Sequence, residues 1–192
     1  MDKEKIIDFF DSLASSWDEH QERREDVIKT ILDIAEVRAG CNVLDVACGT
    51  GILIGDYLDR KAASVTGIDI SPNMIECARS KFPTVDFICD DAQCCSLDKS
   101  FDSIMIYNAF PHFSCPDKLF MNLTSHLKEG GRLTVAHGIS EEELRKCHSG
   151  SAKEISTDLP CKEDMAALMA AYLKVDVMIS DSEKYIVSGR KA

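Results

Sequence analysis

Residues 43–53, VLDVACGTGIL, constrain the fold more than any other part of this sequence. The first residues are apolar and strand-like, Gly49 and Gly51 interrupt the run, and an apolar helical pattern resumes over residues 52–58. Such a turn lets the backbone approach a ligand closely. No Lys-Ser/Thr pair follows, and Ile54 occupies the position of the third glycine of a dinucleotide fingerprint. The loop is therefore predicted to hold something other than a phosphate.

Alternation of strand and helix patterns continues along the chain. Strands are predicted at 42–47, 64–70, 85–91, 101–110, 132–138, 174–182 and 184–192, and helices at 4–14, 22–37, 51–60, 71–82, 116–128, 140–148 and 162–173. This order predicts an α/β fold with an open, mostly parallel seven-stranded sheet and helices on both faces. The last two strands are separated by only a few polar residues, so they should form an antiparallel hairpin.

Local signals support several of these helix boundaries. Ser71 followed by Pro72 is typical of a helix start, and Ser140 with Glu143 three residues later forms a capping box. Gly130 and the glycine after it are expected to end the helix at 116–128.

Composition limits the partners of the chain. At 192 residues it suits a single domain, and its net charge of −11 opposes binding to nucleic acid. No apolar run approaches the ~20 residues needed to span a membrane, and the first twelve residues are too acidic for a signal peptide. We expect a cytoplasmic protein that acts on a small molecule.

The nine cysteines favour reduced thiols over disulfides or a metal centre. The segment CDDAQCC, residues 89–95, places three of them close together, but the paired spacing of zinc ligands is missing. With no signal peptide and a core of adequate size, the cysteines are expected to serve as small apolar residues. No metal is predicted.

Polar residues are expected where the parallel strands end, at the edge where open sheets bind ligands. These residues are Asp69, Asp91, Asn108 and His137. A carboxylate at Asp69 can accept both hydroxyls of a ribose, and one at Asp91 can accept an adenine amino group. Aspartate is also a common capping residue, but two aspartates behind a glycine loop favour an adenosine site.

At this point the chain resembles the class I S-adenosylmethionine-dependent methyltransferases, in particular the small-molecule branch that includes quinone methyltransferases. VLDVACGTG, GIDIS, DDA and FDSIMIYNAF are similar to the family's first four motifs, and LKEGGRLTVA to the loop and strand that follow. FDSLASSWDEH resembles the N-terminal segment in which an aromatic residue closes over the cofactor. The resemblance implies a Rossmann-like fold, S-adenosylmethionine as cofactor and S-adenosylhomocysteine as product.

The resemblance also implies a set of cofactor-binding residues. The loop residues lie beside methionine and ribose, Asp69 binds the ribose, Ile70 stacks on adenine, and Asp91 with Ala92 contacts its rim. The full set is Trp17, Asp45, Ala47, Cys48, Gly49, Gly51, Asp69, Ile70, Asp91, Ala92 and Asn108. Two positions depart from the family pattern, since Ala47 replaces a common glycine and Trp17 replaces the usual tyrosine.

Substrate specificity is predicted in the segment YNAFPHF, residues 107–113, which follows the fourth strand. His112 is its titratable side chain and is the first candidate for a catalytic base, with His137 second. His112, His137 and His148 could converge as bases or metal ligands if the helix after the fifth strand folds back. Residues 1–38 are expected to form a helical lid on a core of residues 39–192, and an insert near 138–162 to cover the substrate.

The predicted reaction is in-line transfer of a methyl group to a small, partly apolar acceptor, in which alignment and exclusion of water supply much of the rate. The sequence leaves open whether the acceptor atom is O, N, C or S, and leaves the oligomeric state open. A non-catalytic cofactor-binding or regulatory protein is the alternative. A nicotinamide-dependent oxidoreductase would need a glycine near position 54, and an RNA methyltransferase is opposed by the negative charge.

Overall fold

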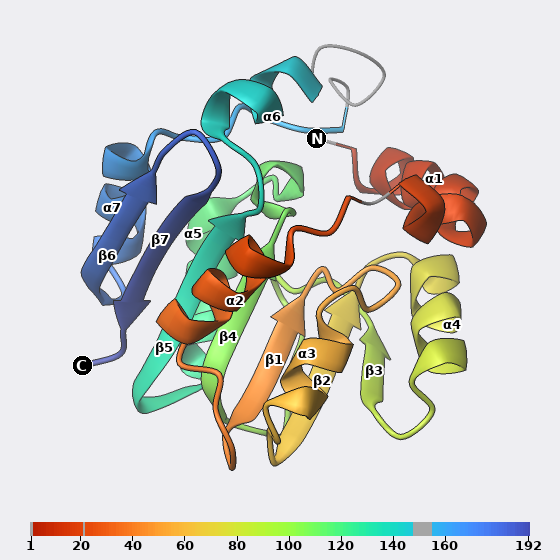
Figure 1. Ribbon diagram of the computed structural model, residues 1–192, viewed down its shortest axis with the longest axis horizontal. Coiled ribbons are helices and arrows are strands. Elements are labelled where there is room, and N and C mark those ends of the chain that lie inside the picture. The colour runs from red at the N-terminus through yellow and green to blue at the C-terminus, as the bar shows by residue number, and fades with distance from the viewer. Residues whose placement is uncertain (1, 21, 148–154) are drawn as a thin grey trace.

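A seven-stranded sheet forms the centre of the protein, in a computed structural model that describes residues 2–20, 22–147 and 155–192. The strand order is β3-β2-β1-β4-β5-β7-β6 (Figure 1). Strands β3, β2, β1, β4 and β5 run parallel to one another, and β7 is antiparallel to both β5 and β6. This arrangement confirms the predicted sheet and its terminal hairpin. The strands are β1 Asn42–Val46, β2 Ser64–Asp69, β3 Asp86–Cys89, β4 Phe101–Tyr107, β5 Leu127–His137, β6 Lys174–Ser180 and β7 Tyr185–Arg190.

Helices cover both faces of this sheet. Figure 1 shows α2 and α3 in front of the sheet and α5 and α7 behind it. Side chains of α2, α3 and α4 pack in one core layer, and those of α5 and α7 pack in the other. The helices are α1 Lys3–Leu13, η1 Ala14–His20, α2 Glu25–Ile34, α3 Ile54–Asp59, α4 Pro72–Lys81, η2 Phe110–His112, α5 Pro116–Ser125, α6 Glu141–Cys147 and α7 Lys162–Ala170.

Both predicted capping signals are present. The Ser71 hydroxyl accepts a hydrogen bond from the Met74 amide at 3.1 Å, and Pro72 is the first residue of α4. At the start of α6, the Ser140 amide and hydroxyl donate to the Glu143 carboxylate, and the Glu143 amide donates to the Ser140 hydroxyl at 3.2 Å. These reciprocal bonds satisfy amides that a helix start otherwise leaves unpaired.

Several predicted boundaries differ from the structure by a few residues, and in two places the predicted type of element was wrong. Helix α5 ends at Ser125, and β5 already begins at Leu127, so the Gly130 region belongs to a strand instead of a helix end. The reason is tertiary, because the Gly130 amide donates to the carbonyl of Lys191 and the Lys191 amide donates to the carbonyl of Gly131. Similarly, β4 ends at Tyr107 and residues 110–112 form the short helix η2.

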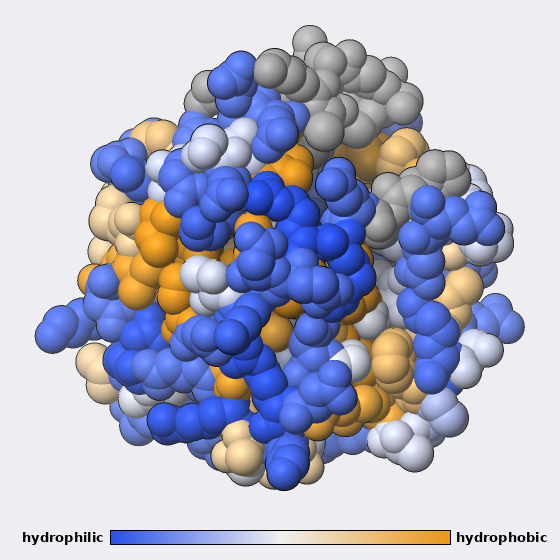
Figure 2. Space-filling view, viewed as in Figure 1, coloured by the Kyte–Doolittle hydropathy of each residue, from blue (hydrophilic) through white to orange (hydrophobic). Residues whose placement is uncertain are grey.

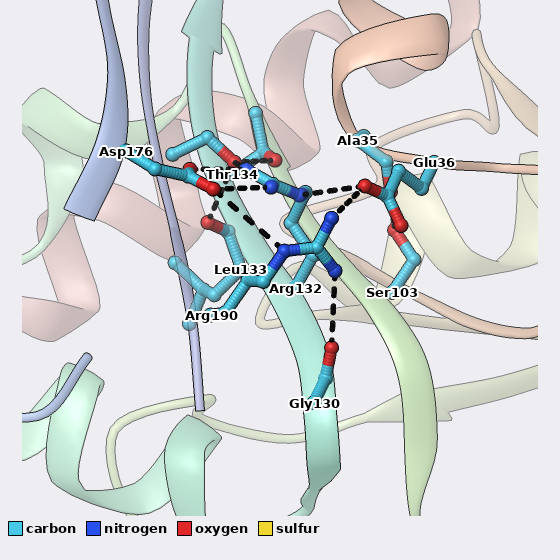
Figure 3. A network of polar contacts seen from close by, with 10 residues as sticks. Ala35, Glu36, Ser103, Gly130, Arg132, Leu133, Thr134, Asp176 and Arg190 are labelled. Atoms are coloured by element: carbon cyan, nitrogen blue, oxygen red, sulfur yellow. Dashed lines mark hydrogen bonds and ion pairs between the residues drawn. The ribbon is translucent and has the colours of Figure 1, made fainter. Parts of the chain in front are cut away.

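A network of charges holds the antiparallel end of the sheet (Figure 3). Arg132 of β5 donates from both Nη atoms to the Asp176 carboxylate of β6, each at 2.7 Å. Arg190 of β7 donates to Glu36, which follows α2 and has a left-handed φ of 56°. The Arg132 side chain is only 5% exposed, so this pairing satisfies a buried charge between the sheet and the α2–β1 connection.

The outer surface is mixed in character. Figure 2 shows that hydrophilic residues dominate the face carrying α2 and α3, while hydrophobic residues gather over the β6–β7 hairpin. Among the helices that the structure describes, none is long and apolar enough to cross a membrane.

Candidate functional site

A cavity lies at the carboxyl ends of β1, β2, β3 and β4, beneath α1 and η1. Most of the predicted site residues line it: Trp17, Ala47, Cys48, Gly49, Asp69, Ile70, Asp91, Ala92, Asn108 and His112. Other residues that line it were not singled out from the sequence, among them Lys3, Ile6, Phe10, Ile52 and Gln93, whereas Tyr107 belongs to the predicted segment YNAFPHF. Phe10 carried a signal, because it is the first residue of FDSLASSWDEH, the segment that resembles the family's closing N-terminal segment.

The loop after β1 is tightly wound. Ala47 and Gly49 have φ values of 54° and 53°, in the left-handed region. The Gly51 amide donates to the Cys48 carbonyl at 2.8 Å, which closes the turn. This geometry places the backbone of residues 47–49 directly on the cavity.

Gly51 and Asp45 lie behind the loop, outside the cavity lining formed by the described residues. Gly51 has a φ of 87°, and a Cβ atom there would lie 3.0 Å from Ile54 Cγ1, so packing requires this glycine. Asp45 is buried inside the sheet, and this burial raises the pKa of its carboxyl to about 8. The Tyr57 side chain lowers this pKa, and the charge of Asp69 raises it further. Both residues shape the loop and do not face the cavity.

Asp69 joins the loop to the end of β2. Its Oδ2 accepts from the Gly49 amide at 2.8 Å, and its Oδ1 accepts from the Ser71 amide at 2.9 Å. Burial raises the pKa of Asp69 despite these amide donors, and the nearby Asp11 carboxylate adds to the rise. Each carboxylate oxygen has two lone pairs, so Asp69 retains acceptor capacity toward the cavity.

Asp91 and Lys3 face each other across the cavity rim. Lys3 Nζ lies 3.2 Å from Asp91 Oδ2, and the Gln93 amide donates to Asp91 Oδ1 at 2.9 Å. Burial opposes ionisation, but the Gln93 donors and the Lys3 ammonium hold the pKa of Asp91 below its usual value. Asp91 is therefore a carboxylate that accepts hydrogen bonds.

Asn108 and Tyr107 form the cavity wall at the end of β4. Asn108 has a left-handed φ of 54°, and its Oδ1 accepts from the Gly138 amide at 2.9 Å. Burial raises the pKa of Tyr107, with a smaller opposing effect of the Asn108 side chain. The Tyr107 hydroxyl consequently stays protonated and can donate a hydrogen bond.

The two candidate bases have different surroundings. His112 lines the cavity, with its ring edge-to-face on Phe10 at 5.1 Å between centroids. His137 is fully buried, packs against Tyr185 and is absent from the lining that the described residues form. The structure thus puts His137 outside the lining of the cavity where the sequence had suggested a second base, because its ring packs against that of Tyr185 in β7, with 6.0 Å between the ring centroids.

The other cysteine and histidine predictions concern metal binding and thiol state. His148 lies outside the described residues. Within ranges 2–20, 22–147 and 155–192, no group of three or more His, Cys, Asp or Glu side chains is arranged to hold a metal ion. The cysteines whose side chains the structure describes are free thiols, and burial raises the pKa of Cys48 well above its ordinary value.

Segment 3–20 is held onto the cavity from two sides. The Asp11 carboxylate accepts from the Ser71 hydroxyl and from the Asn73 amide at the start of α4. The Asp18 carboxylate accepts from the Thr50 hydroxyl and pairs with Lys81 at 2.7 Å. These contacts bring the Trp17 and Phe10 side chains, which are in edge-to-face contact, over the glycine loop.

Comparisons with known proteins agree with this geometry. Residues 43–131 match the family described as "Methyltransferase domain". The chain is 32% identical over 82% of its length to malonyl-[acyl-carrier protein] O-methyltransferase of Acetivibrio thermocellus, and over 56% of its length to demethylmenaquinone methyltransferase of Renibacterium salmoninarum. It spans 58% and 46% of those two proteins, about half of each. The chain therefore contains a methyltransferase domain over residues 43–131, and the relatives that match it over longer stretches are methyltransferases as well.

The fold of this methyltransferase is also found in solved structures. The N-methyltransferase NodS of Bradyrhizobium japonicum WM9, in complex with S-adenosylhomocysteine, superposes with a TM-score of 0.76 at 14% identity over 97% of this chain and 98% of that one. The match confirms the predicted Rossmann-like fold, and the family relationship confirms the predicted S-adenosylmethionine cofactor.

The residues of the methyltransferase cavity suit this cofactor. Two carboxylates, Asp69 and Asp91, come from neighbouring strand ends, and the wound loop presents backbone instead of bulky side chains. The remaining lining includes apolar surface from Ile68, Ile70 and Met74. Hydroxyl-accepting carboxylates beside an apolar slot are what an adenosine needs.

Proposed function

We propose that this methyltransferase transfers a methyl group from S-adenosylmethionine to a small, partly apolar acceptor by in-line displacement. The observation that carries the proposal is the composition of its cavity. Its lining combines the carboxylates of Asp69 and Asp91 with the aromatic rings of Phe10, Phe113 and His112. A cofactor with a polar nucleoside and a reactive methyl group fits such a combination.

Asp69 would bind the ribose hydroxyls while its amide contacts keep the loop in place. Ile70 would pack on the adenine, whose amino group would donate to Asp91 at the rim beside Ala92. The backbone of Ala47, Cys48 and Gly49, the Asn108 side chain and Trp17 would surround the methionyl part. The bound cofactor supplies a methyl group on a sulfonium. After the transfer, the sulfur of the cofactor is a neutral thioether.

The protein contributes alignment, dryness and a proton acceptor. Phe10, Tyr107 and Phe113, which line the cavity, would exclude water from the acceptor. Holding the acceptor in line with the methyl group supplies much of the rate. When the acceptor must lose a proton, His112, which lines the cavity, would receive it.

We infer that segment 3–20 acts as a lid, which is shorter than the predicted lid of residues 1–38 because α2 packs in a core layer against the sheet. Its aspartates Asp11 and Asp18 bind opposite ends of α4, and Asp18 also binds Thr50 of the glycine loop. Opening these contacts would uncover the cavity without disturbing the sheet. The segment after β5, of which residues 138–147 and 155–162 are described, would cover the acceptor from the opposite side.

Charge in the cavity favours a neutral acceptor. Of the described residues that line it, Lys3 and His112 are those able to carry a positive charge, and Lys3 is paired with Asp91. A carboxylate acceptor would face Asp69, Asp90 and Asp91 with little compensation. A quinone-like ring, as in the name of the demethylmenaquinone relative, therefore fits better than a malonyl carboxylate.

Two measurements test the proposal. Calorimetry should show binding of S-adenosylhomocysteine and none of NAD. Incubation of S-adenosylmethionine and the enzyme with pools of small phenols and quinols should then give products heavier by one methyl group in place of a hydrogen. Cofactor binding without methylation of any pool would favour a non-catalytic regulatory role, and failure to bind the cofactor would refute the proposal.

A further inference from the structure

Residues 155–157 dock on η2, more than forty residues away in the chain. The carbonyl oxygen of Ile155 lies 3.0 Å from Nδ1 of His112. The amide and the hydroxyl of Thr157 both donate to the carbonyl of Pro111, at 2.8 and 3.2 Å. Three hydrogen bonds thus connect this segment to two successive residues of η2.

The contact with Ile155 determines which ring nitrogen of His112 carries the proton. A carbonyl oxygen can only accept, so Nδ1 must be the donor. In the neutral imidazole the lone pair then lies on Nε2. In metal-binding and catalytic histidines, a hydrogen bond from one ring nitrogen to a protein acceptor fixes the tautomer in the same manner and leaves the other nitrogen to bind the metal or accept the proton.

The orientation of the ring is determined as well. Phe10 contacts the imidazole edge-to-face, with an angle of 86° between the ring planes. The His112 amide donates to the Ala109 carbonyl at 3.0 Å, and Pro111 restricts the backbone before it. Ile155 is itself anchored, because the residue is only 4% exposed. The imidazole is therefore held between the lid and the 155–157 segment.

We propose that residues 155–157 form a positioning segment for methyl transfer, in which the Ile155 carbonyl keeps His112 in the Nδ1–H form so that Nε2 is the proton acceptor. This rests on the proposed function. The acceptor atom forms its bond to the methyl carbon as the carbon–sulfur bond breaks, and that electron pair stays on sulfur. The proton leaving the acceptor goes to Nε2 and later to solvent.

Nitrogen NMR of the full chain labelled with ¹⁵N-histidine tests this directly. Long-range ¹H–¹⁵N correlations distinguish Nδ1–H from Nε2–H imidazoles, and His112→Asn assigns the His112 signals among the five histidines. We expect the wild-type His112 to be Nδ1–H when neutral. An Nε2–H form would overturn the proposal.

Truncation of the anchor tests whether the segment causes this state. Ile155→Ala should release the segment and give a mixture of tautomers, and the milder Thr157→Val, which loses one of the three bonds, should do so to a smaller extent. Ile28→Ala is the matched control, since Ile28 is buried in the core layer formed with α2, α3 and α4 and the change makes the same truncation away from residues 155–157. Unchanged Nδ1–H signals in both Ile155→Ala and Thr157→Val would refute a positioning role.

Binding of S-adenosylhomocysteine to the same samples separates the two hypotheses. If wild type fails to bind it, the proposed function fails, while the tautomer result still decides whether residues 155–157 set the state of His112. If binding is intact and the tautomer does not respond to the truncations, only the positioning role is lost.

Discussion

Removal of the Asp176 carboxylate should destabilise the antiparallel end of the sheet. Asp176 lies where the register of β6 shifts between Val175 and Val177, and this irregularity turns it toward Arg132. In Asp176→Ala the buried guanidinium would retain only the Ser188 hydroxyl at 3.0 Å and the Glu36 carboxylate at 3.6 Å. A buried charge would then be left with weak compensation.

The structure also indicates the size of the loss. Breaking a fully buried ion pair from one side costs about 3–5 kcal/mol. The Asp176 side chain is 38% exposed and Glu36 remains, so a smaller loss of about 2–3 kcal/mol in the free energy of unfolding is expected. With a urea dependence of ~2 kcal/mol/M for a domain of this size, the unfolding midpoint should fall by roughly 1 M.

A double-mutant cycle separates lost pairing from lost packing. Arg132→Met with Asp176→Ala leaves no unpaired buried charge, so the double variant should be more stable than the sum of the two single losses, by about 1–3 kcal/mol. Asp59→Ala, at an exposed position at the end of α3, serves as the control. Strict additivity, or an Asp176→Ala midpoint equal to that of the control, would refute the reasoning.

Three further predictions concern the site. Asp69→Asn should weaken S-adenosylhomocysteine binding at least tenfold by calorimetry, because an amide replaces a carboxylate that accepts hydrogen bonds; unchanged affinity would leave Asp69 only a role in bracing the loop. Asp45 has a folded pKa of about 8, above its unfolded value, so its contribution to stability is complete below pH ~4 and is lost as the pH rises to about 8. Urea titrations should show wild type losing stability relative to Asp45→Asn over that range, and parallel curves would contradict the buried neutral carboxyl. Asp18→Asn should loosen the lid, because it weakens the contacts of Asp18 with Thr50 and Lys81. Acrylamide should then quench the fluorescence of the single tryptophan, Trp17, more strongly, and a bound ligand should dissociate faster. Quenching equal to that of the wild type would argue against a role of Asp18 in holding the lid closed.

Much of the site could be predicted because it lies at the ends of strands. Hydrophobic runs and turn residues locate where a strand stops, and in a parallel sheet all such ends meet at one edge. Asp69, Asp91 and Asn108 were found in this way, and each lines the cavity. The capping residues Ser71 and Ser140 were equally accessible, because a cap depends on contacts within four residues.

The failures share a different cause. His137 was placed at the correct strand end, but its side chain faces Tyr185 of a strand that begins 48 positions later in the sequence. The helix at 116–128 was extended too far because residues after 126 pair with the C-terminal tail. Local periodicity contains no information about either contact.

The sequence by itself therefore determined the order of the elements, the edge of the sheet that carries the site and most residues on that edge, since these follow from local hydrogen-bonding and burial preferences. Only the tertiary structure decided which way those side chains face. It brought Lys3 to Asp91, Ile155 to His112 and Asp176 to Arg132. Each pair joins residues at least forty positions apart, and the energy that aligns them comes from packing of the whole chain, which no short segment encodes.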